Sequence, residues 1–196
     1  MSGNREIRLD RFSARGFDRG RSKLVELAWL VVDALFVRSW LPGSGWRILI
    51  LRAFGSQIAN GVVIKPCVRI KFPWKLQVGA HSWIGEDVWI DNLAPVRIGK
   101  NCCISQGAYL CTGSHHYRRV TFDLVTRPIV VADGAWLCAM TRVGPGVTIG
   151  EAAVLTIGSV ATKDLSPWTI YTGMPAVRTA TRNPSVADST MRSDSE

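Results

Sequence analysis

The sequence predicts a β-solenoid, a chain wound as a triangular prism with one short strand and one turn for every six residues. Aliphatic residues recur at intervals of six in two separate blocks, and small or slim residues stand two positions before the next aliphatic position in the second block. The first block holds Val78, Ile84 and Ile90 and resumes at Ile98, Ile104 and Leu110; the second holds Val131, Leu137, Val143, Ile149, Leu155 and Ala161. A period of six matches neither an α-helix nor a simple alternating strand, so these side chains are expected to form an inner ladder.

The residues between the aliphatic positions fit the turns of such a prism. Gly, Asn and Asp tolerate compact or left-handed backbone, and they stand at the expected corners, as at Gly85, Asn101 and Gly150. One repeat cannot bury its own apolar side, so successive coils must stack and pair their backbones. A β-meander with a coincidental period is the alternative, and the number of aliphatic positions in register argues against it.

Composition divides the chain into four segments. They are a flexible basic arm at 1–22, a pair of helices within 23–55, the solenoid domain at 56–180 and a polar disordered tail at 181–196. The two helices are expected over the apolar run 24–41 and over a second stretch at 46–54.

The run 24–41, LVELAWLVVDALFVRSWL, is strongly apolar for a helix of a globular domain. Glu26, Asp33 and Arg38 interrupt it, and it is short for a transmembrane span. Two interpretations stay open. The helix packs against the end of the solenoid or another subunit, or it lies on a membrane surface as a peripheral contact.

The net charge of +9 and the isoelectric point near 9.8 indicate anionic partners without saying which. A nucleic-acid partner is not expected, because no basic run with interleaved aromatic residues and no nucleic-acid motif occurs. Five cysteines, an odd number without a CxxC pair, indicate a reduced, cytoplasmic protein. The first twenty residues are polar and basic and contain no apolar core of a secretory signal.

Three breaks in the six-residue register mark insertions. The steps Ile70–Val78 and Ile90–Ile98 are eight residues each, and the step Leu110–Val131 is twenty-one residues. The longest insertion holds the string TGSHHY, followed by two arginines. Because insertions into a regular solenoid usually carry function, this protruding loop is the expected catalytic loop.

Several longer strings resemble the hexapeptide-repeat acetyltransferases. They are TGSHH at 112–116, GPGVTIGE at 144–151, TKD at 162–164 and GMPA at 173–176. LRAFG, FPWKL, WIGEDVWIDN and SQGAYLCTGSHHY are similar to the branch that acts in the synthesis of colanic acid and other exopolysaccharides. The resemblance implies a left-handed parallel β-helix, assembled as a homotrimer, that binds acetyl-CoA between adjacent prisms. It also implies O-acetyl transfer to a sugar hydroxyl.

Such a transfer needs a base for the hydroxyl proton, and the chain has only three histidines. His115 matches the family's catalytic histidine and is the predicted general base. Its other ring nitrogen needs an acceptor, for which Asp123 and a backbone carbonyl are the two candidates. The residues predicted to contact the acceptor sugar are Glu86, Asp87, Asp91, Asn92 and His116. Turn formation explains the acidic residues and Asn92 about equally well.

The resemblance places CoA along the strands that follow the loop. The residues predicted to line this site are Trp136, Ala139, Thr141, Arg142, Thr156 and Ala161, with Lys163 and Arg178 as partners of the CoA phosphates. Two positions depart from the family's pattern. His116 stands where the family often has an acidic residue, and Met174 stands where it usually has asparagine.

Other functions on the same fold give different expectations. A zinc carbonic anhydrase needs three converging histidines, and His81, His115 and His116 lack a suitable spacing, so no metal is expected. A non-catalytic scaffold or sugar-binding solenoid would bind no acetyl-CoA, and a related transferase would use another acyl donor such as an acyl carrier protein. A lipid-linked glycan acceptor would place the enzyme at the inner face of the plasma membrane.

Overall fold

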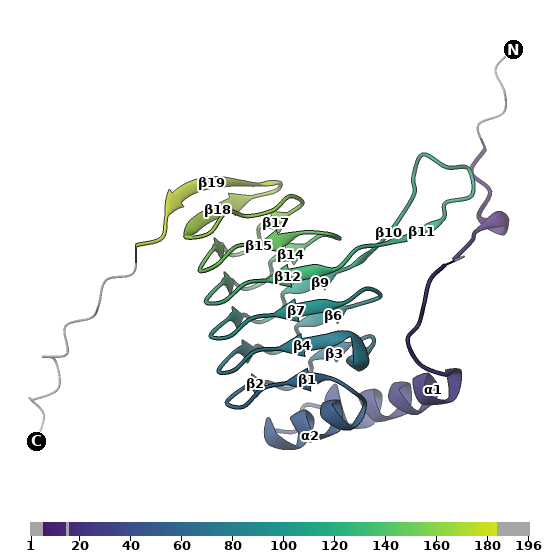
Figure 1. The fold of residues 1–196 in the computed structure, drawn as a ribbon, viewed down its shortest axis with the longest axis horizontal. Coiled ribbons are helices and arrows are strands. Elements are labelled where there is room, and N and C mark those ends of the chain that lie inside the picture. The colour runs from purple at the N-terminus through teal and green to yellow at the C-terminus, as the bar shows by residue number, and fades with distance from the viewer. Residues whose placement is uncertain (1–5, 15, 184–196) are drawn as a thin grey trace, which may run out of the picture.

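The computed structural model describes residues 6–14 and 16–183, and its body is a triangular prism of stacked coils with helices at its base (Figure 1). Each side of the prism is a parallel sheet. The first sheet contains β1 (Gln57–Ile58), β4 (Leu76–Val78), β7 (Val96–Ile98), β12 (Ile129–Val131) and β15 (Thr148–Ile149). The second contains β2 (Val63–Ile64), β5 (Trp83–Ile84), β8 (Cys103–Ile104), β13 (Trp136–Leu137), β16 (Val154–Leu155) and β18 (Thr169–Gly173). The third contains β3 (Arg69–Ile70), β6 (Trp89–Asp91), β9 (Tyr109–Cys111), β14 (Arg142–Val143) and β17 (Val160–Ala161).

The aliphatic ladder lies inside this prism, and the predicted left-handed parallel β-helix is confirmed. Leu137 pairs with Ile104 below it and with Leu155 above it, and all three side chains are fully buried. The preceding small residues, such as Ala135 and Ala153, are also buried. Each coil therefore buries its apolar side against the next, as a chain with a six-residue period must.

The two eight-residue steps form bulges at one corner of the prism. The first contains the short 3₁₀ turn η3 (Pro73–Lys75), and the second contains Asn92. The Asn92 side chain is fully buried, accepts a hydrogen bond from the backbone N–H of Phe72 at 2.9 Å and donates one to its carbonyl at 2.7 Å. Asn92 thus joins the two bulges, because it satisfies buried backbone groups that have no strand partner.

The helical segment covers the base of the prism. It consists of α1 (Lys23–Val32), the π-helical turn η2 (Asp33–Val37) and α2 (Gly45–Ala53). The Ser22 hydroxyl caps α1 at the N–H of Val25, and the Trp29 indole donates to the carbonyl of Ile70 at 3.0 Å. The first helical stretch ends at Val37, four residues before the predicted end at 41. Among residues 6–14 and 16–183, no helix is both long and apolar enough to cross a bilayer.

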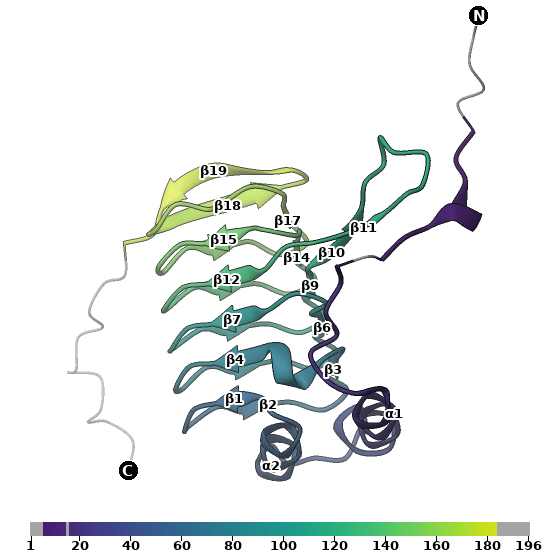
Figure 2. The same cartoon turned by 45° about the vertical axis from the view of Figure 1, so that its right-hand side comes forward.

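The described part of the basic N-terminal segment, 6–14 and 16–22, runs along the outside of the prism and does not project freely (Figure 2). The N–H of Arg8 donates to the carbonyl of Val120 at 2.8 Å, and the carbonyl of Ser13 accepts from Leu124 at 3.1 Å. Nearer the base, the Trp74 indole donates to the carbonyl of Arg19 at 2.6 Å. In these residues the expected flexible arm is therefore a strap between the base of the prism and the loop that follows β9. It includes the short turn η1 (Leu9–Arg11).

The far end of the prism is closed by an antiparallel hairpin of β18 and β19 (Ala176–Thr181). The Arg182 guanidinium binds the carbonyls of Gly134 and Ala152 at 2.9 and 3.0 Å, which ties the chain back to the last coils. Of the disordered tail predicted at 181–196, Thr181 ends β19 and Arg182 makes these contacts, and the residues from 184 onward lie outside the described ones.

Candidate active site

The twenty-one-residue insertion forms a hairpin that leaves the prism after β9. Its arms are β10 (Gly113–His115) and β11 (Leu124–Thr126), which pair antiparallel with His115 opposite Leu124. The hairpin protrudes from one side of the prism, and the strap passes beside it (Figures 1 and 2). The predicted catalytic loop is thus an ordered element held at both ends by strand pairing.

The imidazole of His115 is fixed by two neighbouring residues. Its Nδ1 lies 3.0 Å from the carbonyl oxygen of Phe122, and its ring stacks on the Phe122 ring with centroids 4.3 Å apart and planes 7° apart. Because a carbonyl oxygen only accepts hydrogen bonds, the neutral ring carries its proton on Nδ1. Nε2 then keeps a free lone pair, as a general base requires. On the strap, the ring of Phe12 lies 5.7 Å from the His115 ring, at an angle of 59°.

Asp123 does not orient His115, because its carboxylate is engaged elsewhere. It accepts a hydrogen bond from Arg119 at 3.0 Å. Hydrogen bonds from Thr121 and then Arg119 hold the pKa of this carboxyl below its usual range. The prediction of Asp123 as the partner of His115 is therefore corrected, and the backbone-carbonyl alternative holds, with Phe122 as the residue that supplies it.

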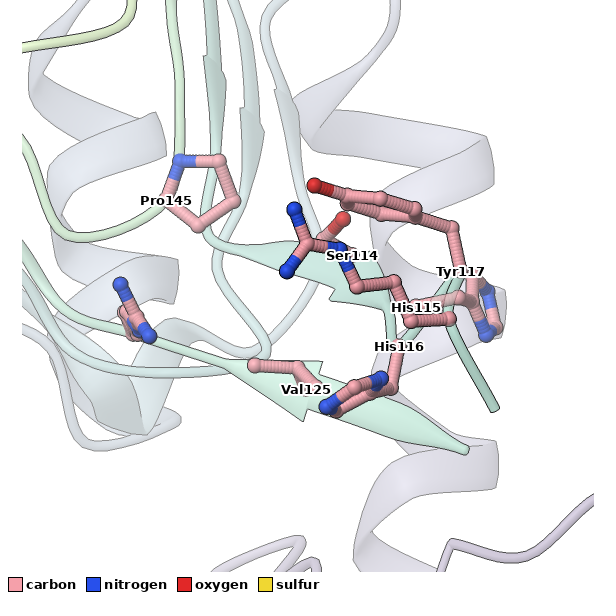
Figure 3. A pocket seen from close by; sticks show the side chains of 8 residues that line it. Ser114, His115, His116, Tyr117, Val125 and Pro145 are labelled. Atoms are coloured by element: carbon pink, nitrogen blue, oxygen red, sulfur yellow. The ribbon is translucent and has the colours of Figure 1, made fainter. Parts of the chain in front are cut away.

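A pocket of about 440 Å³ opens beside the hairpin (Figure 3). It is bounded by both arms of the hairpin, by the arginines that follow them and by the turn before β15. The lining residues are Ser114, His115, His116, Tyr117, Arg118, Val125, Arg127 and Pro145. The pocket therefore brings both loop histidines together with two arginines, in a hollow large enough for a small polar ligand.

The other residues predicted to contact the acceptor lie away from this pocket. Glu86 lines a second pocket, of about 370 Å³, on the sheet that carries Trp83. Asp87 occupies a turn with a φ of 56° and is exposed. Asp91 accepts a hydrogen bond from the Tyr109 hydroxyl at 3.2 Å. Asn92 is fully buried in the bulge contacts described above, so its side chain is not available to a ligand.

The predicted CoA-lining residues divide into exposed and buried ones. Trp136 and Arg142 face outward from strands on two different sides of the prism, and Lys163 and Arg178 are also exposed. Ala139 and Thr156 are half-buried. The side chains of Thr141 and Ala161 lie inside the prism, and the Thr141 hydroxyl donates to the carbonyl of Cys138 at 2.8 Å. These two side chains cannot line a surface site.

Within 6–14 and 16–183, no group of three histidine, cysteine or acidic side chains is arranged to hold a metal ion. All five cysteines are free thiols, and burial raises the pKa of Cys102.

Comparison with known proteins identifies the family of the chain. No protein-family model matches the chain. The chain is 40% identical over 165 residues to WcaF, named as a colanic acid biosynthesis acetyltransferase, of Escherichia coli (strain K12), and the match covers 83% of this chain and 90% of that protein. The chain belongs to the hexapeptide-repeat acetyltransferases.

Solved structures with the same fold agree with this family. A hexapeptide-repeat acetyltransferase of Vibrio cholerae complexed with acetyl-CoA superposes with a TM-score of 0.76 at 22% identity, over 89% of this chain and 97% of the other. A galactoside acetyltransferase in complex with coenzyme A gives a TM-score of 0.73 at 22% identity, over 82% of both chains. Because both structures are only 22% identical to this chain, their similarity shows a shared fold.

Several residues of the site carry no signal in the sequence that would have singled them out. Phe122 acts through its backbone carbonyl, which any residue at that position could supply, and its φ of 50° is set by the turn. Phe12 belongs to a segment more than one hundred residues away from His115 in the chain. Arg118 follows the string TGSHHY, whereas Arg127 is visible only as a member of a generally basic chain.

Proposed function

We propose that this protein is an O-acetyltransferase that moves the acetyl group of acetyl-CoA to a sugar hydroxyl during exopolysaccharide synthesis of the colanic acid type. The observation that carries the proposal is the state of His115, whose Nδ1 faces the Phe122 carbonyl in a hairpin that also borders a pocket. Membership of the family and the name of the 40% identical relative support the reaction class and the pathway type.

The proposed reaction uses His115 as a proton shuttle. Nε2 takes the proton of the attacking hydroxyl while the sugar oxygen bonds to the thioester carbonyl carbon. Collapse of the tetrahedral intermediate breaks the carbon–sulfur bond, and the imidazolium returns the proton to the leaving sulfur of CoA. The Phe122 carbonyl keeps the ring in one orientation through the reaction, because it accepts a hydrogen bond from Nδ1–H in both protonation states.

The donor site that we propose uses the outward side chains beyond the loop. The pantetheine would follow Trp136, Ala139, Arg142 and Thr156, and Lys163 and Arg178 would bind phosphates, since both are exposed cations. Thr141 and Ala161 are left out because their side chains are inside the prism. In a homotrimer, these surfaces would meet the prism of the next subunit, and acetyl-CoA would lie between them.

For the acceptor, we propose a glycan held in the His115 pocket. His116 and Arg118 line this pocket and offer donors to sugar hydroxyls or to an acidic sugar. Asp91 and Glu86 stay in the proposal as contacts made by a longer glycan. The free cysteines fit a reducing compartment, so we place the reaction in the cytoplasm.

The test is acetyl transfer by the purified full-length chain. Acetyl-CoA and acyl carrier protein donors are offered with candidate oligosaccharides, release of the free thiol is followed, and the product is identified by the mass of one added acetyl group. His115→Ala is expected to lower kcat by about 10²–10⁴ while the melting temperature is unchanged. The matched variant His116→Ala, at the next position of the same pocket, is expected to keep most of kcat.

Three results would contradict the proposal. Undiminished turnover of His115→Ala would remove the assigned base. Transfer from the acyl carrier protein alone would change the donor. Absence of acetyl-CoA binding by the folded protein would favour a non-catalytic solenoid.

A further inference from the structure

The helix pair α1–η2 presents its apolar residues to the outside. Only Trp29, Asp33 and Val37 of this segment are buried against the prism, one residue in every four. The opposite side, here called the outer face, carries six large aliphatic or aromatic side chains. It consists of Leu24, Leu27, Leu30, Val31, Leu35 and Phe36, each between 47% and 79% exposed.

This arrangement reverses that of a helix on a water-soluble domain. Such a helix buries its apolar stripe and exposes its charges, whereas α1–η2 buries the carboxylate of Asp33 and exposes six large apolar side chains. A concentration of exposed large apolar side chains on one short helical segment marks an interaction surface. The medium or partner that covers the outer face is therefore apolar.

The surroundings of the outer face carry positive charge with little opposing charge. Residues 19–53 contain six basic and two acidic residues. Of the two acids, Glu26 is paired with Arg19 at 2.7 Å, and Asp33 is buried. Arg21, Lys23 and Arg38 are exposed around the ends of the helical stretch, and Trp40, just beyond it, is 77% exposed.

We propose that the outer face of α1–η2 docks on the surface of an anionic lipid bilayer, with the helix lying in the plane of the membrane. An apolar face bordered by arginine, lysine and an exposed tryptophan has the chemistry of the bilayer interface, where apolar side chains enter the acyl region and cations meet lipid phosphates. The stretch does not span the bilayer, because no described helix has the length. The proposal concerns the base of the prism and does not depend on the transfer reaction.

A second copy of the chain fits this surface less well than a membrane does. Self-association through the outer face would bring the basic residues of two subunits together without acidic partners, because Glu26 is already paired with Arg19 and Asp33 is buried. A bilayer containing anionic lipid supplies both the apolar layer and the missing negative charge.

The experiment is co-sedimentation of the full-length protein with vesicles of phosphatidylcholine containing phosphatidylglycerol, compared with vesicles of phosphatidylcholine alone. The test variant is the double substitution Leu30→Glu and Leu35→Glu, at side chains already half exposed or more. The matched control is Leu9→Glu with Val177→Glu, which places two carboxylates at exposed aliphatic positions outside the helical base.

The wild type and the control are expected to bind the anionic vesicles, and the test variant at least about tenfold more weakly. Binding of the wild type is expected to weaken at raised ionic strength. Equal sedimentation of wild type and test variant would overturn the proposal, as would absence of wild-type binding. A smaller assembly mass for the test variant in light scattering, without lipid, would instead assign the outer face to subunit contact.

Discussion

Replacing Asp33 by asparagine is expected to stabilise the helical base, and increasingly so as the pH rises. Burial raises the pKa of Asp33 from 3.8 to about 7, although the nearby cations Arg38 and Arg69 act in the opposite direction. Only 9% of the side chain is exposed, Oδ1 has no hydrogen-bond partner, and Arg38 approaches Oδ2 no closer than 3.8 Å. The site therefore suits a neutral carboxylic acid or a carboxamide better than a carboxylate.

The sign and the size of this pH-dependent change in stability follow from proton linkage. Because the folded pKa of Asp33 is the higher one, its contribution to stability is full below about pH 3.8 and is lost as the pH rises to about 7. Over this whole pH range the free energy of unfolding falls by about 4 kcal/mol, because the pKa differs by about three units at 1.36 kcal/mol each. Relative to the asparagine variant, the opening constant of the wild type is expected to grow about a hundredfold between about pH 5 and pH 8.

Hydrogen exchange of peptides that cover α1–η2, measured without lipid at several pH values, is the appropriate assay. The ratio of wild-type to variant protection at each pH removes the intrinsic pH dependence of exchange. Glu26→Gln is the matched control on the same helix, because the hydrogen bonds from Arg19 lower the pKa of Glu26. That variant should lose protection at neutral pH and approach the wild type as the pH falls. A wild-type-to-Asp33→Asn ratio that is constant from pH 5 to pH 8 would refute a buried, high-pKa Asp33.

Two further substitutions test the contacts around the site and the bulges. Phe12→Ala is expected to lower kcat by up to about tenfold with the KM for acetyl-CoA unchanged, since an aromatic contact is worth about 0.5–1.5 kcal/mol. The control Phe17→Ala lies on the same strap but packs on Phe72, so it should leave kcat unchanged. Equal effects of the two substitutions on kcat would contradict a role for Phe12. Asn92→Ala is expected to lower the free energy of unfolding by about 1–3 kcal/mol in urea titrations, because the buried N–H of Phe72 loses its partner while the Phe72 carbonyl keeps its hydrogen bond from Lys75. Glu86→Ala, at an exposed turn, should be neutral, and a neutral Asn92→Ala would show that water replaces the side chain.

The sequence predicted the features that follow from periodicity and missed those that depend on where individual atoms meet. Ladder positions such as Leu137 are fixed by the six-residue period, and the break after Leu110 located the protruding hairpin. The partner of His115 could not be read from the sequence, because a backbone carbonyl has no residue type and an acidic side chain nearby was the more visible candidate.

Polar residues at the bulges show the same limit. Asn92 and Asp91 are adjacent in the chain, yet one is fully buried between two coils and the other is half-buried on a strand. The two assignments differ only by which side of the backbone each side chain occupies. The described strap likewise carries the composition of a free basic arm and is instead held by backbone hydrogen bonds, which composition does not report.

The two proposals together set the height of the active site above a membrane. The hairpin that carries His115 leaves the prism after β9, at the end of the third coil. In the third sheet, β9 lies two strand spacings above β3, because the strand order is β3, β6, β9. Strand spacings of about 4.8 Å and a helix layer about 10 Å thick place the hairpin about 20 Å above a bilayer that contacts the outer face. A sugar attached directly to a lipid diphosphate would lie below that level. A lipid-linked acceptor is therefore expected to be acetylated only on sugars added later, and fragmentation of the product by mass spectrometry would locate the acetyl group. Acetylation of a lipid-linked monosaccharide by the vesicle-bound protein would contradict this height.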